Sequence, residues 1–128
     1  IVDLLTWMHQ NKVDYTNTFC HLMSLKDYDD GLYKDDNFQN WKKNWQKRLR
    51  LNNNTPENYI NLMRSVNPLI IPRNHKIEES LEKANDNNLK SFNKLLEILK
   101  KPYAVQENIS DYLKMDSSLK EYKTFCGT

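Results

Sequence analysis

An otherwise helical sequence is interrupted near the middle of this 128-residue chain by Asn67-Pro68-Leu69-Ile70-Ile71-Pro72-Arg73-Asn74-His75. Two prolines flank three large aliphatic residues, and a residue that precedes a proline avoids helical backbone angles. We therefore expect residues 67–73 to cross the fold as an extended, buried segment. On either side, apolar residues recur at intervals of three and four, and glycine and proline are scarce. The sequence thus predicts an all-α fold.

The crossing divides the chain into two expected helical halves, residues 1–66 and 67–116, followed by an extended tail at 117–128. A length of 128 residues suits one irregular helical domain with a modest core. The first residue is Ile1, and the helical spacing of apolar residues begins at once. We therefore expect a segment of a larger protein, whose active site can lie elsewhere.

The first half is expected to contain four helices. One covers residues 1–10, Asp14 caps the next, and a third follows the acidic surface loop Asp27–Asp36. Thr55-Pro56-Glu57 has the hydroxyl, proline and acid that are typical of a helix start. The side chains expected to face inward are Tyr15, Phe19, Leu22, Met23, Phe38, Trp41, Trp45, Leu49, Tyr59, Ile60, Met63 and Val66.

The second half is expected to contain two longer helices and a short one. The first follows the crossing, the second is capped by Asn88 or a neighbour and stopped by Pro102, and the short helix lies near Ile109–Met115. The side chains expected to face inward are Ile77, Leu81, Ala84, Leu89, Phe92, Leu95, Leu96 and Leu99.

Charge and composition bound the possible partners. The formal net charge is +2, from 19 basic and 17 acidic side chains, so no strong attraction to nucleic acid or to an anionic membrane is expected. No apolar run approaches the roughly 20 residues that a membrane span needs. Two cysteines do not make a disulfide scaffold, and a reducing cytosol is the expected compartment.

Several patterns that suggest chemistry have simpler structural explanations. Gly31 and Gly127 lie too far apart for a glycine-rich phosphate loop, and Asp29-Asp30-Gly31 is typical of a solvated turn. The three histidines have no metal-ligand spacing. The Trp41–Arg50 stretch mixes tryptophan with basic residues, as nucleic-acid-binding surfaces do. Its tryptophans are four residues apart, however, which favours a core stripe with the bases on the opposite face.

The motif Pro72-Arg73-Asn74-His75 opens a helix directly after the crossing. Helix N-termini bind anions, so one interpretation is a ligand site. The other is structural: Arg73 and Asn74 would satisfy loop carbonyls and cap the helix. We favour the structural interpretation.

The two cysteines have different expected environments. Cys20 lies between Phe19 and Leu22 and is expected to be a buried, inert thiol. Cys126 belongs to the C-terminal Thr124-Phe125-Cys126-Gly127-Thr128, where an exposed thiol can ionise, oxidise or pair with another thiol. Chemistry alone leaves a working thiol and a passive one equally open at this position.

Three stretches together resemble one protein family. They are Val13-Asp14-Tyr15-Thr16, the segment from Asn67-Pro68 to Pro72-Arg73-Asn74-His75, and Thr124–Thr128. The stretches Trp41–Leu49 and Leu95–Tyr103 also fit. With these motifs in this order, the chain resembles the C-terminal part of the selenoprotein O family in its bacterial-type, cysteine-containing form.

The resemblance implies a fold and an activity for the longer protein. It implies a kinase-like (pseudokinase) fold, of which this chain would be a late part of the C-lobe plus the extended tail. It further implies a protein adenylyltransferase that moves AMP from ATP to Ser, Thr or Tyr hydroxyls, with Mg²⁺ or Mn²⁺. The catalytic, nucleotide-binding and metal-binding residues would all lie upstream, so none is assigned to this chain.

The resemblance also implies partners and a regulatory residue. The partners would be the upstream kinase-like lobe and protein substrates, without nucleic acid or membrane, in the bacterial cytoplasm. Eukaryotic relatives carry selenocysteine near their C-terminus, and Cys126 occupies the comparable redox-capable position. The alternative function is a non-enzymatic helical interaction module that uses the Trp41–Arg50 helix or the tail.

Overall fold

The computed structural model describes residues 1–23, 31–52 and 55–115, and within these ranges the regular structure is helical throughout. The elements are α1 Val2–Gln10, α2 Tyr15–Leu22, the short 3-10 helix η2 Leu32–Lys34, α3 Asp36–Leu51, α4 Pro56–Val66, α5 Asn74–Asn85, α6 Lys90–Leu99 and α7 Ser110–Leu113. The all-α prediction is confirmed. The expected tail at 117–128, with Cys126, lies outside the described residues.

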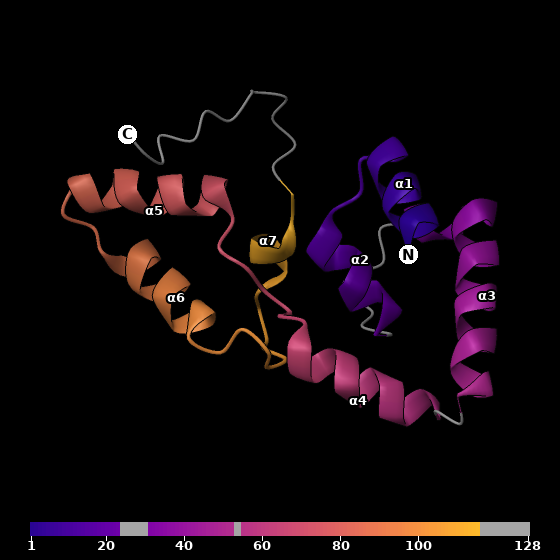
Figure 1. Ribbon diagram of the computed structural model, residues 1–128. Coiled ribbons are helices and arrows are strands. Elements are labelled where there is room, and N and C mark those ends of the chain that lie inside the picture. Colours follow the sequence, from indigo (N-terminus) through magenta and orange to yellow (C-terminus); the bar gives the residue numbers. More distant parts are fainter. Residues whose placement is uncertain (24–30, 53–54, 116–128) are drawn as a thin grey trace, which may run out of the picture.

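The helices form two groups joined by α4 and the extended crossing. Figure 1 shows α1, α2 and α3 grouped on one side, the α5–α6 pair on the other, and α7 between them. No helix in the described ranges has the length and apolar character needed to cross a membrane. Nothing in this arrangement tests the expected division at residue 66, which stays a prediction.

Three helices begin at side-chain caps that the local sequence encodes. Asp14 accepts the backbone N–H of Asn17 at 2.7 Å, as predicted for the start of α2. Thr55 accepts from the amide of Asn58 at 3.3 Å, with a proline in the first turn of α4, also as predicted. Asp35 caps α3, a role that sequence reasoning did not assign. These caps satisfy amides that the first helical turn leaves without partners.

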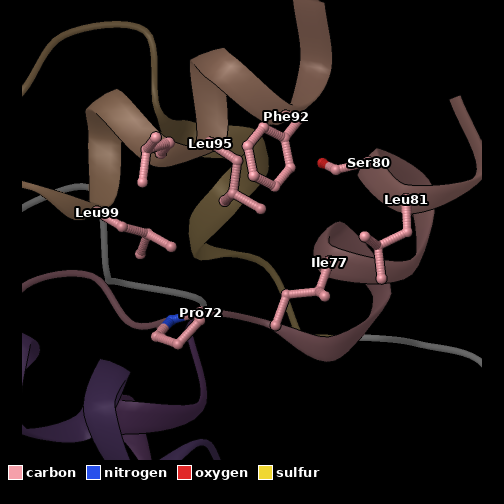
Figure 2. Close-up of a pocket in the computed structure, with 8 residues that line it drawn as sticks. Pro72, Ile77, Ser80, Leu81, Phe92, Leu95 and Leu99 are labelled. Carbon is pink, nitrogen blue, oxygen red and sulfur yellow. The ribbon is translucent and has the colours of Figure 1, made fainter. Parts of the chain in front are cut away.

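The α5–α6 pair encloses a shallow apolar groove of about 190 Å³. Figure 2 shows side chains from both helices directed toward the same space, with Pro72 at one end. Four residues on these helices were expected to face inward but are exposed: Leu81 at 47%, Leu89 at 54%, Phe92 at 41% and Leu96 at 44%. The prediction was wrong there because no element of the described ranges covers these side chains, whereas Leu95 and Ile98 of α6 are buried.

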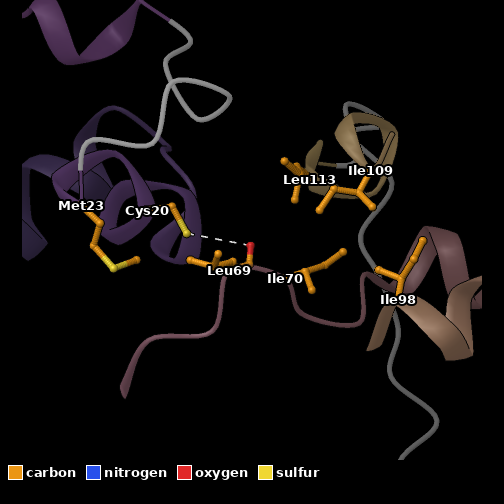
Figure 3. Close-up of a cluster of buried hydrophobic side chains, with 7 residues drawn as sticks. All are labelled: Cys20, Met23, Leu69, Ile70, Ile98, Ile109 and Leu113. Atoms are coloured by element: carbon orange, nitrogen blue, oxygen red, sulfur yellow. Dashed lines mark hydrogen bonds between the residues drawn. The ribbon is translucent and has the colours of Figure 1, made fainter. Parts of the chain in front are cut away.

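The crossing is buried at the centre of the fold, which confirms its prediction. Leu69 and Ile70 are each 2% exposed. Both of their amides donate to the carbonyl of Pro102, at 2.7 and 3.3 Å, so the crossing is paired with the segment that follows α6. Figure 3 shows the cluster built around it, which consists of Cys20, Met23, Leu69, Ile70, Ile98, Ile109 and Leu113.

A second cluster, rich in aromatic residues, lies among α1, α2, η2 and α3. Its buried members are Leu4, Trp7, Met8, Leu22, Tyr33 and Phe38. Because α2 supplies Leu22 to this cluster and Cys20 to the crossing cluster, it links the two. The side chain of Met63 on α4 packs against both.

The surface-loop prediction for Asp27–Asp36 is wrong at its described end. Tyr33 is 1% exposed, its ring lies 5.1 Å from that of Phe38, and its hydroxyl lies 3.3 Å from the Thr18 hydroxyl. Burial of tyrosine is favourable when the hydroxyl finds a partner, which Thr18 supplies. Asp35 accepts the indole N–H of Trp7 at 2.7 Å and thereby links this segment to α1.

Two further residues of the first half were expected to face inward and are exposed, Tyr15 at 60% and Val66 at 63%. Both stand at the end of a helix, where neighbouring elements cover less of the apolar face. The predicted burial of Leu22, Met23, Phe38 and Leu95 is confirmed. The remaining inward predictions, including Trp41 and Trp45, are half-buried positions.

Replacing Phe38 by alanine tests the aromatic cluster. Phe38 is fully buried, with ring centroids 4.7 Å from Trp7 and 5.7 Å from His21. The cavity left by Phe38→Ala should lower the free energy of unfolding by about 3–5 kcal/mol, measured by urea denaturation. Leu62→Ala is the matched control on α4, because Leu62 is 67% exposed and its loss should cost less than about 0.5 kcal/mol. Equal losses for the two variants would contradict the assigned core.

Candidate functional site

The Pro72-Arg73-Asn74-His75 motif stands where the crossing meets α5. Arg73 has extended backbone angles, φ −89° and ψ 129°, and occupies the cap position of that helix. No side-chain hydrogen bond caps α5, so the prediction that Arg73 and Asn74 cap it is wrong. The four residues of the motif lie in different environments. Pro72 lines the groove, and Arg73 points toward α2. Asn74 is exposed and His75 is half-buried.

The Arg73 guanidinium forms a paired interaction with the Asp14 carboxylate. Its Nη1 bonds Asp14 Oδ2, and its Nη2 donates to Asp14 Oδ1 at 2.9 Å. Two parallel hydrogen bonds of this kind match the planar guanidinium fork and are stronger than neutral ones. Only 13% of the Arg73 side chain and 14% of the Asp14 side chain are exposed, so the pair is largely shielded from solvent.

The same guanidinium also connects α2 to α7. Its Nη2 donates to Asn17 Oδ1 at 3.1 Å and lies 3.3 Å from the carbonyl of Leu113. The side-chain Nδ2 of Asn17 donates to that same carbonyl at 3.1 Å. Arg73, Asp14, Asn17 and the Leu113 carbonyl therefore form one closed set of contacts, which we call the Arg73 network. Arg73 was expected to contact a loop carbonyl, but the main-chain carbonyl it meets belongs to the last residue of α7.

The network favours the charged form of Asp14. Burial alone would raise the pKa of this carboxyl, but hydrogen bonds from Arg73 and from the Asn17 amide, with the positive charge of Arg73, outweigh that effect. The pKa of Asp14 is therefore lowered from its ordinary value of 3.8. Asp14 thus serves both as the cap of α2 and as the counter-ion of Arg73.

Cys20 has the buried environment that the sequence predicts. Its side chain has no exposed surface, and its Sγ lies 3.8 Å from the carbonyl of Pro68 and 3.9 Å from that of Leu69. Figure 3 shows Cys20 beside Leu69, at the contact between α2 and the crossing. The Cys20 side chain therefore fills space in the hydrophobic core, which is typical of structural cysteines.

The tryptophans of α3 form part of an aromatic row. Trp41 stacks on Trp45 with ring centroids 5.8 Å apart, and Trp45 meets Tyr59 of α4 edge-on at 5.2 Å. Both tryptophans are half-buried, whereas the basic residues Lys43, Lys47, Arg48 and Arg50 are exposed. The arrangement agrees with the predicted apolar stripe and its basic opposite face, and it joins α3 to α4.

The histidines occupy separate environments. His21 stacks on the ring of Tyr33 at 4.0 Å, His9 is exposed on α1, and His75 is half-buried at α5. Among the described residues, no three His, Cys, Asp or Glu side chains come close enough together to hold a metal ion.

A second polar contact, which sequence reasoning missed, attaches α7 to the α5–α6 pair. Lys76 of α5 bonds the Asp111 carboxylate of α7 and also Glu79 at 3.2 Å. The ammonium groups of Lys76 and of Lys94 on α6 each lie 5.6 Å from the ring centre of Tyr112. No local sequence pattern signals this arrangement, since the partners come from three separate helices.

Replacing Asp14 by asparagine tests the charge of the network. Asparagine is a good helix cap, so Asp14→Asn retains the α2 cap and removes the partner of a shielded cation. We expect the free energy of unfolding to fall by about 3 kcal/mol in urea denaturation, near the lower end of the effect of breaking a buried pair. Asp35→Asn is the matched control, with the same change at the cap of α3, and should cost less than about 1 kcal/mol. Equal effects would show that the ion pair adds nothing to the cap.

The lowered pKa of Asp14 also predicts an acid-dependent loss of stability. Because the carboxyl binds its proton more weakly in the folded state, its contribution is present above the unfolded value near 3.8 and is lost as pH falls toward the folded value. Urea denaturation at a series of pH values from neutral downward should show a shallower acid decline in Asp14→Asn than in the parent chain. Parallel declines would contradict the assignment.

Comparison with known proteins places the chain in a family. The family model described as protein adenylyltransferase SelO matches residues 1–100. The protein nucleotidyltransferase YdiU of Pelagibacter ubique is 46% identical over all of this chain and 27% of the relative. The proteins of the same name from Clostridium beijerinckii and Alcanivorax borkumensis are 40% and 39% identical, again over all of this chain and 26% and 27% of the relatives. No solved structure matches the chain. The chain spans about a quarter of the length of these relatives. It belongs to the SelO family of protein adenylyltransferases.

Proposed function

We propose that this chain is the C-terminal helical part of a protein adenylyltransferase that transfers AMP from ATP to Ser, Thr or Tyr hydroxyls of proteins. The observation that carries the proposal is the match to the SelO family over residues 1–100, together with relatives that align with the whole chain. Because the chain spans about a quarter of those relatives, the proposed activity belongs to the longer protein.

The proposed division of labour places the chemistry upstream. AMP transfer requires a bound nucleotide and a divalent cation, which neutralises charge on the phosphates. We assign ATP and Mg²⁺ or Mn²⁺ to an upstream kinase-like (pseudokinase) lobe and no catalytic or cofactor-binding residue to this chain. The geometry of Arg73 supports this assignment, since a cation that is committed to Asp14 and to the Leu113 carbonyl does not fit a role in holding phosphates.

The proposed task of this chain is to support that upstream lobe. The Arg73 network and the buried crossing hold the helices in a defined arrangement. Large apolar side chains remain on the surface of the chain. Exposed examples are Val2 at 70%, Leu51 at 76% and Val66 at 63%. An upstream lobe that packs against these side chains would remove their apolar surface from water. Protein substrates would then bind the longer protein in the bacterial cytoplasm.

We also propose a regulatory role for Cys126, which lies outside the described residues. Its thiol would pair with a thiol of the upstream lobe and control access to the active site. In that exchange two thiols are oxidised to one disulfide, while a small disulfide such as oxidised glutathione is reduced to two thiols. Cys20 is unsuited to be the partner, because it is fully buried at the crossing.

A non-enzymatic interaction module is the alternative. The exposed apolar residues and the aromatic row of α3 would serve a binding surface equally well. Membership of an adenylyltransferase family favours the enzyme. An upstream sequence without an ATP-binding lysine and metal-binding aspartate would favour the module.

An activity comparison tests the proposed division of labour. With α-labelled ATP and Mg²⁺, the full-length protein should label protein acceptors with AMP, whereas residues 1–128 alone should neither label them nor bind ATP in calorimetry. Measurable ATP affinity of the isolated chain would contradict the upstream location of the nucleotide. An inactive full-length protein with an intact upstream lobe would overturn the enzyme assignment.

Replacing Cys126 by serine tests the regulatory role. In the full-length protein, AMP transfer should change between oxidising and reducing conditions, and Cys126→Ser should remove that dependence. Cys20→Ala is the matched control, because it removes a buried thiol and should leave the redox response in place. The idea fails if Cys126→Ser responds to oxidant as the parent protein does.

A further inference from the structure

The basic residues of α3 have different surroundings from the lysines near α5, α6 and α7. In α5 and at the ends of α6 and α7, lysines pair with carboxylates three or four residues away. The only acid of α3 is Asp36 in its first turn, whereas its bases are Lys42, Lys43, Lys47, Arg48 and Arg50. None of these bases forms an ion pair with another residue of the described ranges. The positive charge of α3 is therefore available to a partner.

Three of these cations lie on one exposed face of the helix. Lys43, Lys47 and Arg50 follow one another at intervals of four and three residues, which places side chains on the same side of an α-helix. All three side chains are exposed, and Leu51, one turn after Lys47, is 76% exposed. Like charges at this spacing repel each other along a helix. We call the surface formed by these four residues the α3 basic face.

The aromatic residues of α3 belong to its inner side. Trp41 and Trp45 pack against the aromatic cluster, and Trp45 also meets Tyr59 of α4. Figure 1 shows α3 at the edge of its group of helices, with α1 and α2 on one side of it. The α3 basic face therefore has no aromatic ring on which a nucleic-acid base could stack, which favours a protein partner with carboxylates over a single-stranded nucleic acid.

We propose that the α3 basic face binds an acidic helical segment of another protein. The carboxylates of that segment pair with Lys43, Lys47 and Arg50, and an apolar residue covers Leu51. From Lys43 to Leu51 the helix rises about 12 Å, which is roughly two turns of a partner helix. Binding also relieves the repulsion among the three cations. The proposal does not depend on the proposed enzymatic function, because it rests on the contacts and charges of α3.

A labelled peptide tests the proposal in fluorescence anisotropy with the whole chain of 128 residues. The probe is a helical peptide whose glutamates repeat at intervals of four and three and are followed by a leucine. The parent chain should bind it with an affinity that falls as NaCl is raised. A control peptide with glutamine at each glutamate should bind roughly tenfold more weakly, because the ion pairs are lost together. Equal affinities for the two peptides, or no binding of either, would overturn the proposal.

Two triple variants separate the α3 basic face from the total charge of the chain. Lys43→Gln, Lys47→Gln and Arg50→Gln together should weaken binding of the glutamate peptide roughly tenfold. The matched control makes the same change at three exposed lysines on and after α6, which are Lys90, Lys100 and Lys101. At 0.15 M salt, where the screening length is about 8 Å, the control should keep the parent affinity. Urea denaturation checks that both variants fold. Equal losses in the two variants would contradict the assigned surface.

Charge reversal and a nucleic-acid probe complete the test. Glutamate at the three cation positions of the α3 basic face should abolish binding of the glutamate peptide and create binding of a peptide with lysines in its place. A labelled DNA duplex of similar length should bind the parent chain more weakly than the glutamate peptide does. Tighter binding of the duplex, lost in the glutamine variant of the face, would assign the surface to nucleic acid and overturn the proposal.

Discussion

The paired interaction between Arg73 and Asp14 is the constraint on which the rest of the structure depends. It joins residues that are 59 positions apart and brings the end of the crossing against the start of α2. A largely buried guanidinium needs a counter-ion, and a carboxylate in the same place needs a cation, so neither partner is stable there without the other. The Nη2 atom of Arg73 also contacts Asn17 Oδ1 and the Leu113 carbonyl, which extends the constraint to α7.

The two hydrophobic clusters are consistent with that constraint. With α2 held against the crossing, Cys20 lies on Leu69 in one cluster while Leu22 enters the aromatic cluster. The Pro102 carbonyl then accepts the amides of Leu69 and Ile70, so these two buried donors of the extended segment have a partner. This segment packs in one cluster, and Met63 of α4 packs against both.

The position of Arg73 also changes the interpretation of the motif that contains it. A helix start rich in hydrogen-bonding side chains suggests a ligand site, yet Arg73 turns away from α5 and binds α2 and α7. Arg73 of the motif therefore has a structural role, because it holds the end of the crossing against α2 and α7. Surfaces that remain open to partners lie elsewhere, along the α5–α6 groove and on the exposed apolar residues of α1, α3 and α4.

The sequence by itself determined the helical class, the caps at Asp14 and Thr55, the buried crossing and the buried Cys20, because these follow from local chemistry and from the spacing of apolar residues. The resemblance of its motifs also indicated the family. Only the tertiary structure decided that Tyr33 is buried, that Arg73 pairs with Asp14, and that Phe92 and Leu96 stay exposed. Periodicity marks the apolar face of a helix, but whether another element covers that face depends on contacts between residues far apart in the chain.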